Sequence, residues 1–142
     1  MSPFPGLESV RSAPVARLAT VRPDGRPHVV PIVFAIVEDH TLVFAVDGKP
    51  KRTLQLQRLR NIAVQPAVSI LVDHYAADWA ALWWVRVDGI AAEVADEARR
   101  AVYVAALAAK YSQYRTEPPR DAVVAVSISV TTAWAADGRA LP

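Results

Sequence analysis

The sequence contains no cysteine. Disulfide bridges, thiolate metal sites and a cysteine nucleophile are therefore excluded. A chain without cysteine suits the cytoplasm, which is the compartment that we expect. Residues 1–6 hold two prolines and no apolar stretch, unlike a signal peptide, and no uncharged apolar run has the length of a membrane span. We therefore expect no membrane partner.

The chain also has little net charge, since 16 Lys and Arg face 14 Asp and Glu, for a formal charge of +2. An excess this small does not by itself indicate nucleic acid binding. The glycine-rich motifs of dinucleotide and nucleoside triphosphate sites are missing, and so is a nucleophile elbow. Catalysis by protein side chains alone is therefore not expected.

Histidine is scarce as well: only His28, His40 and His74 occur, without the i, i+4 spacing of a zinc hydrolase. Asp73 and His74 could form a metal site with Asp78 after folding. A cluster that caps a strand end is the commoner arrangement of such residues. We therefore expect no metal.

With 142 residues and 53% hydrophobic content, the chain predicts one globular domain over 1–142, with its core at about 10–135. Periodicity predicts helices at 5–13, 53–64 and 96–111, and a loop at 111–121. It predicts strands at 15–21, 28–37, 41–46, 68–73, 82–94 and 123–132. About six strands, mostly linked by hairpins, and two or three helices indicate a mainly β fold, a closed or partly closed antiparallel barrel.

Pro31 stands in the middle of the expected strand 28–37. Proline cannot donate a hydrogen bond to a neighbouring strand. It therefore marks a sheet edge, a bulge, or a place where something other than a strand lies alongside.

A basic stretch precedes the helix expected at 53–64: Lys49, Lys51 and Arg52 fall within four positions, and Thr53 follows. A helix start offers free backbone N–H groups and the positive end of a dipole, which favour an anion. Lysine and arginine add charge-assisted donors. We interpret this stretch as a phosphate clamp for a cofactor; a solvated basic turn is the alternative.

Aromatic residues cluster just after the middle of the chain, at Tyr75, Trp79, Trp83 and Trp84. Packing in a core or interface is the ordinary role of such residues, and we expect it for Trp83 and Trp84. Trp79 lies in the expected turn and is the best candidate to cover a flat ring or a pocket mouth. A phosphate clamp, an apolar strand with a proline and a nearby tryptophan together suit a flavin-like ring.

These segments resemble a known family. Residues 17–21 (RLATV), 24–28 (DGRPH) and 30–34 (VPIVF) are similar to the FMN-binding-like split β-barrel of the pyridoxamine-5′-phosphate-oxidase class. Residues 49–53 (KPKRT), 58–62 (RLRNI), 71–75 (LVDHY) and 82–86 (LWWVR) resemble its actinobacterial subgroup of F420 (deazaflavin)-dependent oxidoreductases. The resemblance covers residues 10–135.

The resemblance implies a homodimer with two cofactor sites at the subunit interface. Lys51, Arg52 and Thr53 would hold the cofactor phosphate, with Lys49 nearby. The backbone of His28, Val30, Pro31 and Ile32 would run beside the ring, and Trp79 would approach from the partner subunit or cover the substrate side. Arg58 and Arg60 would bind the acidic tail of F420, or are surface charges of the helix.

The implied activity is hydride transfer between reduced F420 and a conjugated small organic substrate. FMN is the alternative cofactor. A carrier that binds flavin, deazaflavin or haem without turnover is a second alternative, and a nucleic-acid binder is the weakest. Tyr75, His74 or solvent could supply a proton.

Overall fold

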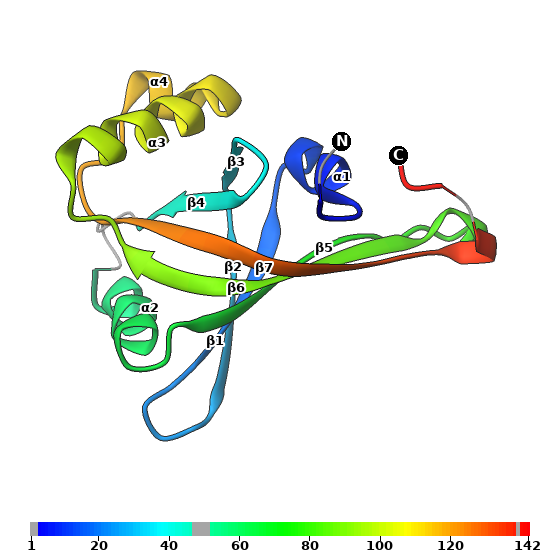
Figure 1. Cartoon of the computed structure of the whole chain (residues 1–142), viewed down its shortest axis with the longest axis horizontal. Coiled ribbons are helices and arrows are strands. Elements are labelled where there is room, and N and C mark those ends of the chain that lie inside the picture. Colours follow the sequence, from blue (N-terminus) through cyan, green and yellow to red (C-terminus); the bar gives the residue numbers. More distant parts are fainter. Residues whose placement is uncertain (1–2, 47–51, 139) are drawn as a thin grey trace.

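The structure is a computed structural model that describes residues 3–46, 52–138 and 140–142 (Figure 1). For residues 52–56 it describes the helical backbone but not the side chains. Within the described ranges, no helix has the combination of length and apolar character that crossing a membrane requires.

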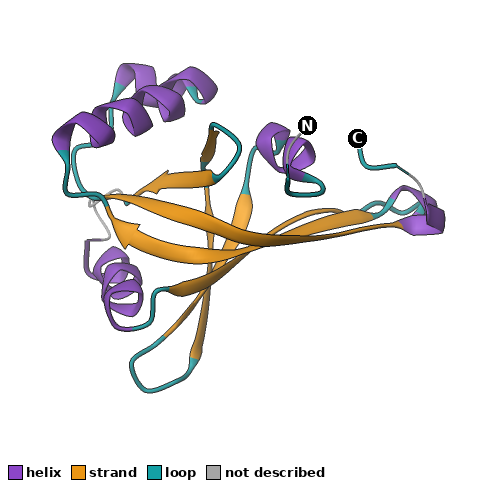
Figure 2. Ribbon diagram, viewed as in Figure 1, coloured by secondary structure: helices purple, strands orange, loops and turns teal. Residues whose placement is uncertain are grey.

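Seven strands form a single curled, antiparallel sheet (Figure 2). They are β1 (Ala16–Val21), β2 (Pro27–Ile32), β3 (Ala35–Val37), β4 (Thr41–Ala45), β5 (Ala67–His74), β6 (Trp83–Glu93) and β7 (Val123–Ala135). Their order across the sheet is β2-β1-β5-β6-β7-β4-β3. The mainly β, barrel-like fold class that the sequence predicts is thereby confirmed.

Within the described residues, four α-helices flank the sheet: α1 (Leu7–Ser12), α2 (Arg52–Val64), α3 (Glu97–Lys110) and α4 (Ser112–Thr116). Two short 3-10 turns, η1 (Trp79–Ala81) and η2 (Ala136–Gly138), lie at the far end of the longest strands. The helices expected at 53–64 and 96–111 are present within a residue or so. Asp96 caps α3 by accepting a hydrogen bond from the Ala98 backbone N–H.

The prediction of a loop at 111–121 is wrong for its first part, because residues Ser112–Thr116 form α4. The Arg115 side chain of α4 turns back and donates to the backbone oxygen of Ala108 at 2.6 Å. Carbonyl groups at a helix end lack partners within the helix. Their capping by an arginine from the next segment stabilises the extra turn, and local sequence periodicity does not reveal such a contact.

The expected strand 28–37 is also corrected: it is interrupted at residues 33–34 and forms two strands, β2 and β3. Phe34 is fully buried, and its backbone N–H donates to the Tyr111 hydroxyl at 3.1 Å instead of to a strand. That hydroxyl in turn donates to the backbone oxygen of Pro14 at 2.9 Å. Pro31 lies in β2, opposite Arg17 of β1. β2 is an edge strand of the described sheet, which is one of the alternatives that the sequence predicted for this proline.

The two faces of the sheet are covered differently. The inner face holds the main core, with Leu18, Ile70 and Val85 fully buried. The outer face is covered by α3 at the β3–β4 end, where Tyr103 and Leu107 pack with Val43 and Val123. No described helix packs on the outer face of β1, β2 and β5.

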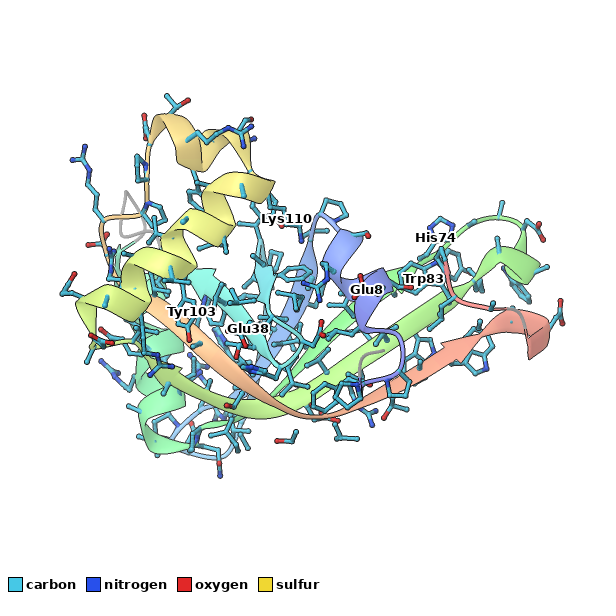
Figure 3. The ribbon with its side chains drawn as sticks, turned by 45° about the horizontal axis from the view of Figure 1, so that its top comes forward. Glu8, Glu38, His74, Trp83, Tyr103 and Lys110 are labelled. Carbon is cyan, nitrogen blue, oxygen red and sulfur yellow. The ribbon has the colours of Figure 1, made fainter. Side chains whose placement is uncertain are left out.

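Lys110, the last residue of α3, packs its ammonium against an aromatic ring (Figure 3). Its Nζ lies 3.8 Å from the Phe34 ring centroid and is buried without a hydrogen-bond partner among the described residues. Burial lowers the pKa of Lys110 to about 8, whereas the ring face favours the charged form. The contact joins α3 to the point where β2 and β3 separate.

The Lys110 burial predicts a pH-dependent stability. Lysine in an unfolded chain titrates near pH 10.4, so between about pH 8 and pH 10 the unfolded chain binds more protons and folding stability rises with pH. Lys110→Met should remove this rise and raise the stability at pH 7 by about 1 kcal/mol, or roughly 3 °C in Tm. Thermal unfolding of both proteins at pH 7 and pH 9.5 measures the difference. Equal pH dependence of wild type and variant would contradict the prediction.

Candidate cofactor site

The inner face of β2 carries the first part of the candidate site. Burial alternates along this strand, so the side chains of His28, Val30 and Ile32 face inward and Pro31 faces outward. Val30 and Ile32 pack with the main core. His28 is the polar residue of this inward row and lies closest to the β1–β2 turn.

Helix α2 packs on the same side of the sheet. Asn61 of α2 is fully buried and donates from Nδ2 to the Thr20 hydroxyl of β1 at 3.0 Å, while Gln57 Nε2 donates to Asn61 Oδ1 at 2.6 Å. Thr20 pairs in register with His28. This buried hydrogen-bond chain fixes the rotation of α2 and brings its Arg58 near the His28 imidazole.

His28 and Arg58 both hold buried nitrogen atoms, Nδ1 and Nε, that have no hydrogen-bond partner among the described residues. Burial lowers the pKa of His28, and the positive charges of Arg22 and Arg58 lower it further. Burial also lowers the pKa of Arg58. Unpaired buried donors and an uncompensated cation are costly, so an acidic ligand group would stabilise this place. These residues fit a phosphate or a carboxylate.

The basic stretch of the sequence ends at the start of α2. The helix begins at Arg52, and Thr53 follows in its first turn, in agreement with the predicted helix start. Lys49 and Lys51 lie outside the described residues, and the side chains of Arg52 and Thr53 are not described. The phosphate clamp therefore stays a prediction.

Arg58 and Arg60 occupy different faces of α2. Two positions along a helix differ by about 200° in direction. Arg58 is half-buried toward β2, whereas Arg60 is exposed. Of the two arginines that the sequence offers for an acidic tail, only Arg58 lies beside His28.

Trp79 lies far from this place. It begins η1 at the tip of the β5–β6 connection and is 69% exposed. Asp78 caps the 3-10 turn η1, and not a strand end, by accepting a hydrogen bond from Ala80 N at 3.1 Å. α2 and η1 lie at opposite ends of the sheet in Figures 1 and 3. One chain does not bring Trp79 to His28 and Arg58.

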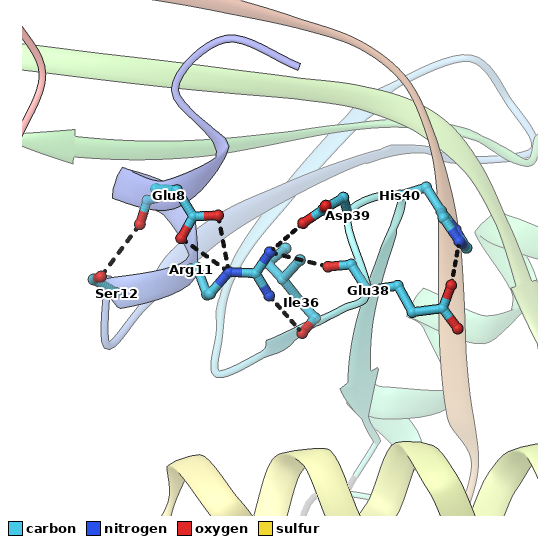
Figure 4. A network of polar contacts seen from close by, with 7 residues as sticks. All are labelled: Glu8, Arg11, Ser12, Ile36, Glu38, Asp39 and His40. Atoms are coloured by element: carbon cyan, nitrogen blue, oxygen red, sulfur yellow. Dashed lines mark hydrogen bonds and ion pairs between the residues drawn. The ribbon is translucent and has the colours of Figure 1, made fainter. Parts of the chain in front are cut away.

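Two further polar clusters are structural. His40 bonds the Thr41 hydroxyl and the Glu38 carboxylate through its two ring nitrogens. Arg11 of α1 donates to the Glu38 backbone oxygen at 3.0 Å and to Asp39 at 2.8 Å, which ties α1 to the β3–β4 hairpin (Figure 4). Within the described ranges, no three His, Asp or Glu side chains gather as a metal site would require.

The bare outer face of the sheet holds a groove of about 560 Å³ that sequence reasoning did not identify. Its floor is apolar, with Ala19, Val29, Leu71 and Trp84. Val29 is 62% exposed. Alternation along β1, β2 and β5 places these side chains on one face, but the sequence alone does not say that no helix of the same chain covers it.

The His28–Arg58 pair leads to a prediction. Arg58→Gln should raise the pKa of His28, because it removes a positive charge that disfavours the imidazolium. Following the three histidine side chains by NMR through a pH titration measures this. Arg60→Gln is the matched control and should leave the titration unchanged, since Arg60 is exposed on another face of α2. An unchanged His28 titration in Arg58→Gln would show that the two groups do not interact.

Comparison with solved structures places this fold among cofactor-binding proteins. A structure described as an F420 reductase is 28% identical, with 93% of this chain and 98% of that chain covered and a TM-score of 0.64. An FAD-binding protein from Mesorhizobium loti is 20% identical, with 89% of each chain covered and a TM-score of 0.65. The haem storage protein HutZ from Vibrio cholerae is 18% identical, with 95% of each chain covered and a TM-score of 0.67.

No curated protein sequence matches this chain. The family model of pyridoxamine 5′-phosphate oxidase matches residues 7–135, a range that holds every described strand of the sheet and α1 to α4. This match covers far more than half of the 142 residues. The chain therefore belongs to the pyridoxamine 5′-phosphate oxidase family.

Proposed function

We propose that this protein is an F420-dependent oxidoreductase that transfers a hydride between the reduced deazaflavin and a conjugated small organic substrate. The observation that carries the proposal is the set of two buried nitrogens without a hydrogen-bond partner among the described residues, His28 Nδ1 on β2 and Arg58 Nε in the middle of α2. The likeness to an F420 reductase over nearly the whole of both chains supports the choice of cofactor.

Each part of the candidate site has a role in this proposal. Arg52 and Thr53 at the start of α2, with Lys51 and Lys49 before them, hold the cofactor phosphate. The backbone of β2 from His28 to Ile32 lies along the ring. Arg58 binds an acidic group of the tail, whereas Arg60 is an exposed surface charge of the helix.

The bound deazaflavin would supply the hydride-carrying ring carbon. The chain itself binds and orients this group and keeps water from it. His28 serves as a neutral imidazole near pH 7, because its pKa is lowered, so it accepts or donates one hydrogen bond without adding charge. Arg58 supplies the permanent positive charge beside it. Tyr75 and His74 are the candidates for moving a proton, unless solvent does so.

We also propose that two copies form a homodimer and that each cofactor site is completed by the partner. Trp79 and α2 lie at opposite ends of one chain, which supports the approach of Trp79 from a second copy. The apolar outer groove supports the same assembly, since a second copy would cover Leu71 and Val29.

A carrier function is the second candidate. The likeness to FAD-binding and haem storage proteins supports it at the level of the fold. FMN would need the phosphate clamp but not the tail-binding role of Arg58.

Cofactor titrations test the proposal. The fluorescence of F420, and separately of FMN, is followed as purified protein is added. Lys51→Ala/Arg52→Ala should weaken both by tenfold or more, since each charge-assisted hydrogen bond contributes about 1.5–3 kcal/mol. Arg58→Gln should weaken F420 by roughly tenfold and FMN less, and Arg60→Gln is the exposed control.

Turnover separates the two candidate functions. An oxidoreductase oxidises reduced F420 when an acceptor such as a quinone is added, whereas a carrier binds F420 and leaves it reduced. Preference for FMN would point to a flavin enzyme. Preference for haem, seen as a Soret band, would point to a haem carrier. If none of the three ligands binds, the cofactor hypothesis fails.

The dimer proposal predicts the effect of a charge in the outer groove. Val29→Asp should convert a dimer into a monomer, because a carboxylate would be buried between the copies at a position that faces the apolar Ala19 across the strand pair. Analytical ultracentrifugation measures the mass, and circular dichroism checks that the variant is folded. Val102→Asp on α3, where Val102 is 56% exposed, is the control and should leave the mass unchanged. A wild-type monomer would contradict the proposed assembly.

A further inference from the structure

A second cavity lies at the end of the sheet away from α2. β5 continues to His74, but the residues of β1 that pair with it end at Arg17, opposite Leu71. The chain before β1 diverges from β5 here, and a cavity of about 620 Å³ opens between them. Ser12, Arg17, Asp73, His74, Tyr75 and Trp83 are among its walls.

One wall of this cavity is flat and aromatic. His74 and Trp83 pair in register across β5 and β6, and their rings are stacked with centroids 6.2 Å apart and planes 18° apart. Both labels lie together at this end of the sheet in Figure 3. Two stacked rings leave one ring face at each end of the stack, and a planar conjugated ligand can stack on the face that borders the cavity.

Most polar side chains around the cavity make no hydrogen bond with another described residue. Among the described residues, Arg17, Asp73, His74 and Tyr75 have no hydrogen bond or ion pair through their side chains, whereas the Ser9 hydroxyl already donates to the Pro142 backbone oxygen at 2.5 Å. Arg17 offers two parallel N–H donors to a carboxylate. Asp73 on the same rim disfavours a second negative charge.

We propose that this cavity is a binding site for a planar conjugated small molecule with a single carboxylate. The flat part of the molecule lies against the His74–Trp83 wall, and its carboxylate bonds Arg17. Tyr75, which is 72% exposed, covers the opening. The site goes beyond the proposed cofactor function. Its walls share no residue with the His28–Arg58 region, but they include His74 and Tyr75, the proton-transfer candidates of the proposed reaction, so the test is made without cofactor.

Isothermal titration with 2-naphthoate tests the proposal, with cyclohexanecarboxylate as the non-planar comparison and 2-naphthol as the uncharged one. Wild type should bind 2-naphthoate saturably and at least tenfold more tightly than cyclohexanecarboxylate. His74→Ala should weaken 2-naphthoate about fivefold, by loss of stacking. Arg17→Gln should weaken 2-naphthoate about tenfold and leave 2-naphthol unchanged.

Trp83 and Trp84 provide a matched pair of variants, because they are neighbours on opposite faces of β6. Trp83 lines the cavity and Trp84 lines the outer groove. Trp83→Leu should weaken 2-naphthoate, and Trp84→Leu should not. Arg17 also borders the outer groove, so weaker binding in Arg17→Gln supports the cavity only if His74→Ala weakens binding too. His74 is exposed, so its replacement leaves the core intact.

Absence of saturable binding by folded wild type would overturn the proposal. Equal loss in Trp83→Leu and Trp84→Leu, with no loss in His74→Ala, would place the ligand in the outer groove and overturn it too. Failure of F420 to bind would leave this result untouched, since the titration contains no cofactor.

Discussion

The pairing of β6 with β7 is the interaction on which the rest of the structure depends. These are the longest strands, and they pair antiparallel along nearly their whole length, from Trp83–Ala135 to Glu93–Val124. They join the α2 end of the sheet to the η1 end. Their register shifts at Asp88 and Gly89, where a Cβ on residue 89 would lie 2.8 Å from a Val126 methyl group. Glycine permits the close approach that this irregularity requires.

The charged side chains that lie partly inside this fold differ in whether other described residues bind them. Arg11 is satisfied by carbonyl and carboxylate oxygens from the β3–β4 hairpin, and it serves only to hold α1 in place. Arg58 and Lys110 are half-buried, and Arg58 Nε and Lys110 Nζ have no hydrogen-bond partner among the described residues. Lys110 has an aromatic face against it and therefore belongs to the packing of α3. Arg58 lies near the His28 imidazole, whose pKa it lowers and which cannot neutralise its charge, so Arg58 is the residue that a ligand would complete.

The sequence predicted most elements because alternation and helical spacing are local. It did not predict the interruption at residues 33–34, since the hydroxyl that binds the Phe34 N–H comes from Tyr111, 77 residues later. It offered Arg58 and Arg60 equally, because charge composition says nothing of helix rotation, which the buried Asn61–Thr20 hydrogen bond fixes. The His74–Trp83 wall was missed for the same reason: their pairing across two strands depends on register.

The distribution of tryptophan has a spectroscopic consequence. All four tryptophans, Trp79, Trp83, Trp84 and Trp134, belong to β6, β7 or the β5–β6 connection, near the η1 end of the sheet. Tryptophan fluorescence, excited selectively over tyrosine, therefore reports on that end of the sheet. Unfolding of α2 alone would leave the tryptophan emission unchanged, whereas a structural change near η1 would account for most of any change in that emission. Emission and far-ultraviolet ellipticity would then follow different parts of one molecule, and their coincidence would become a direct measure of how cooperatively the two ends unfold.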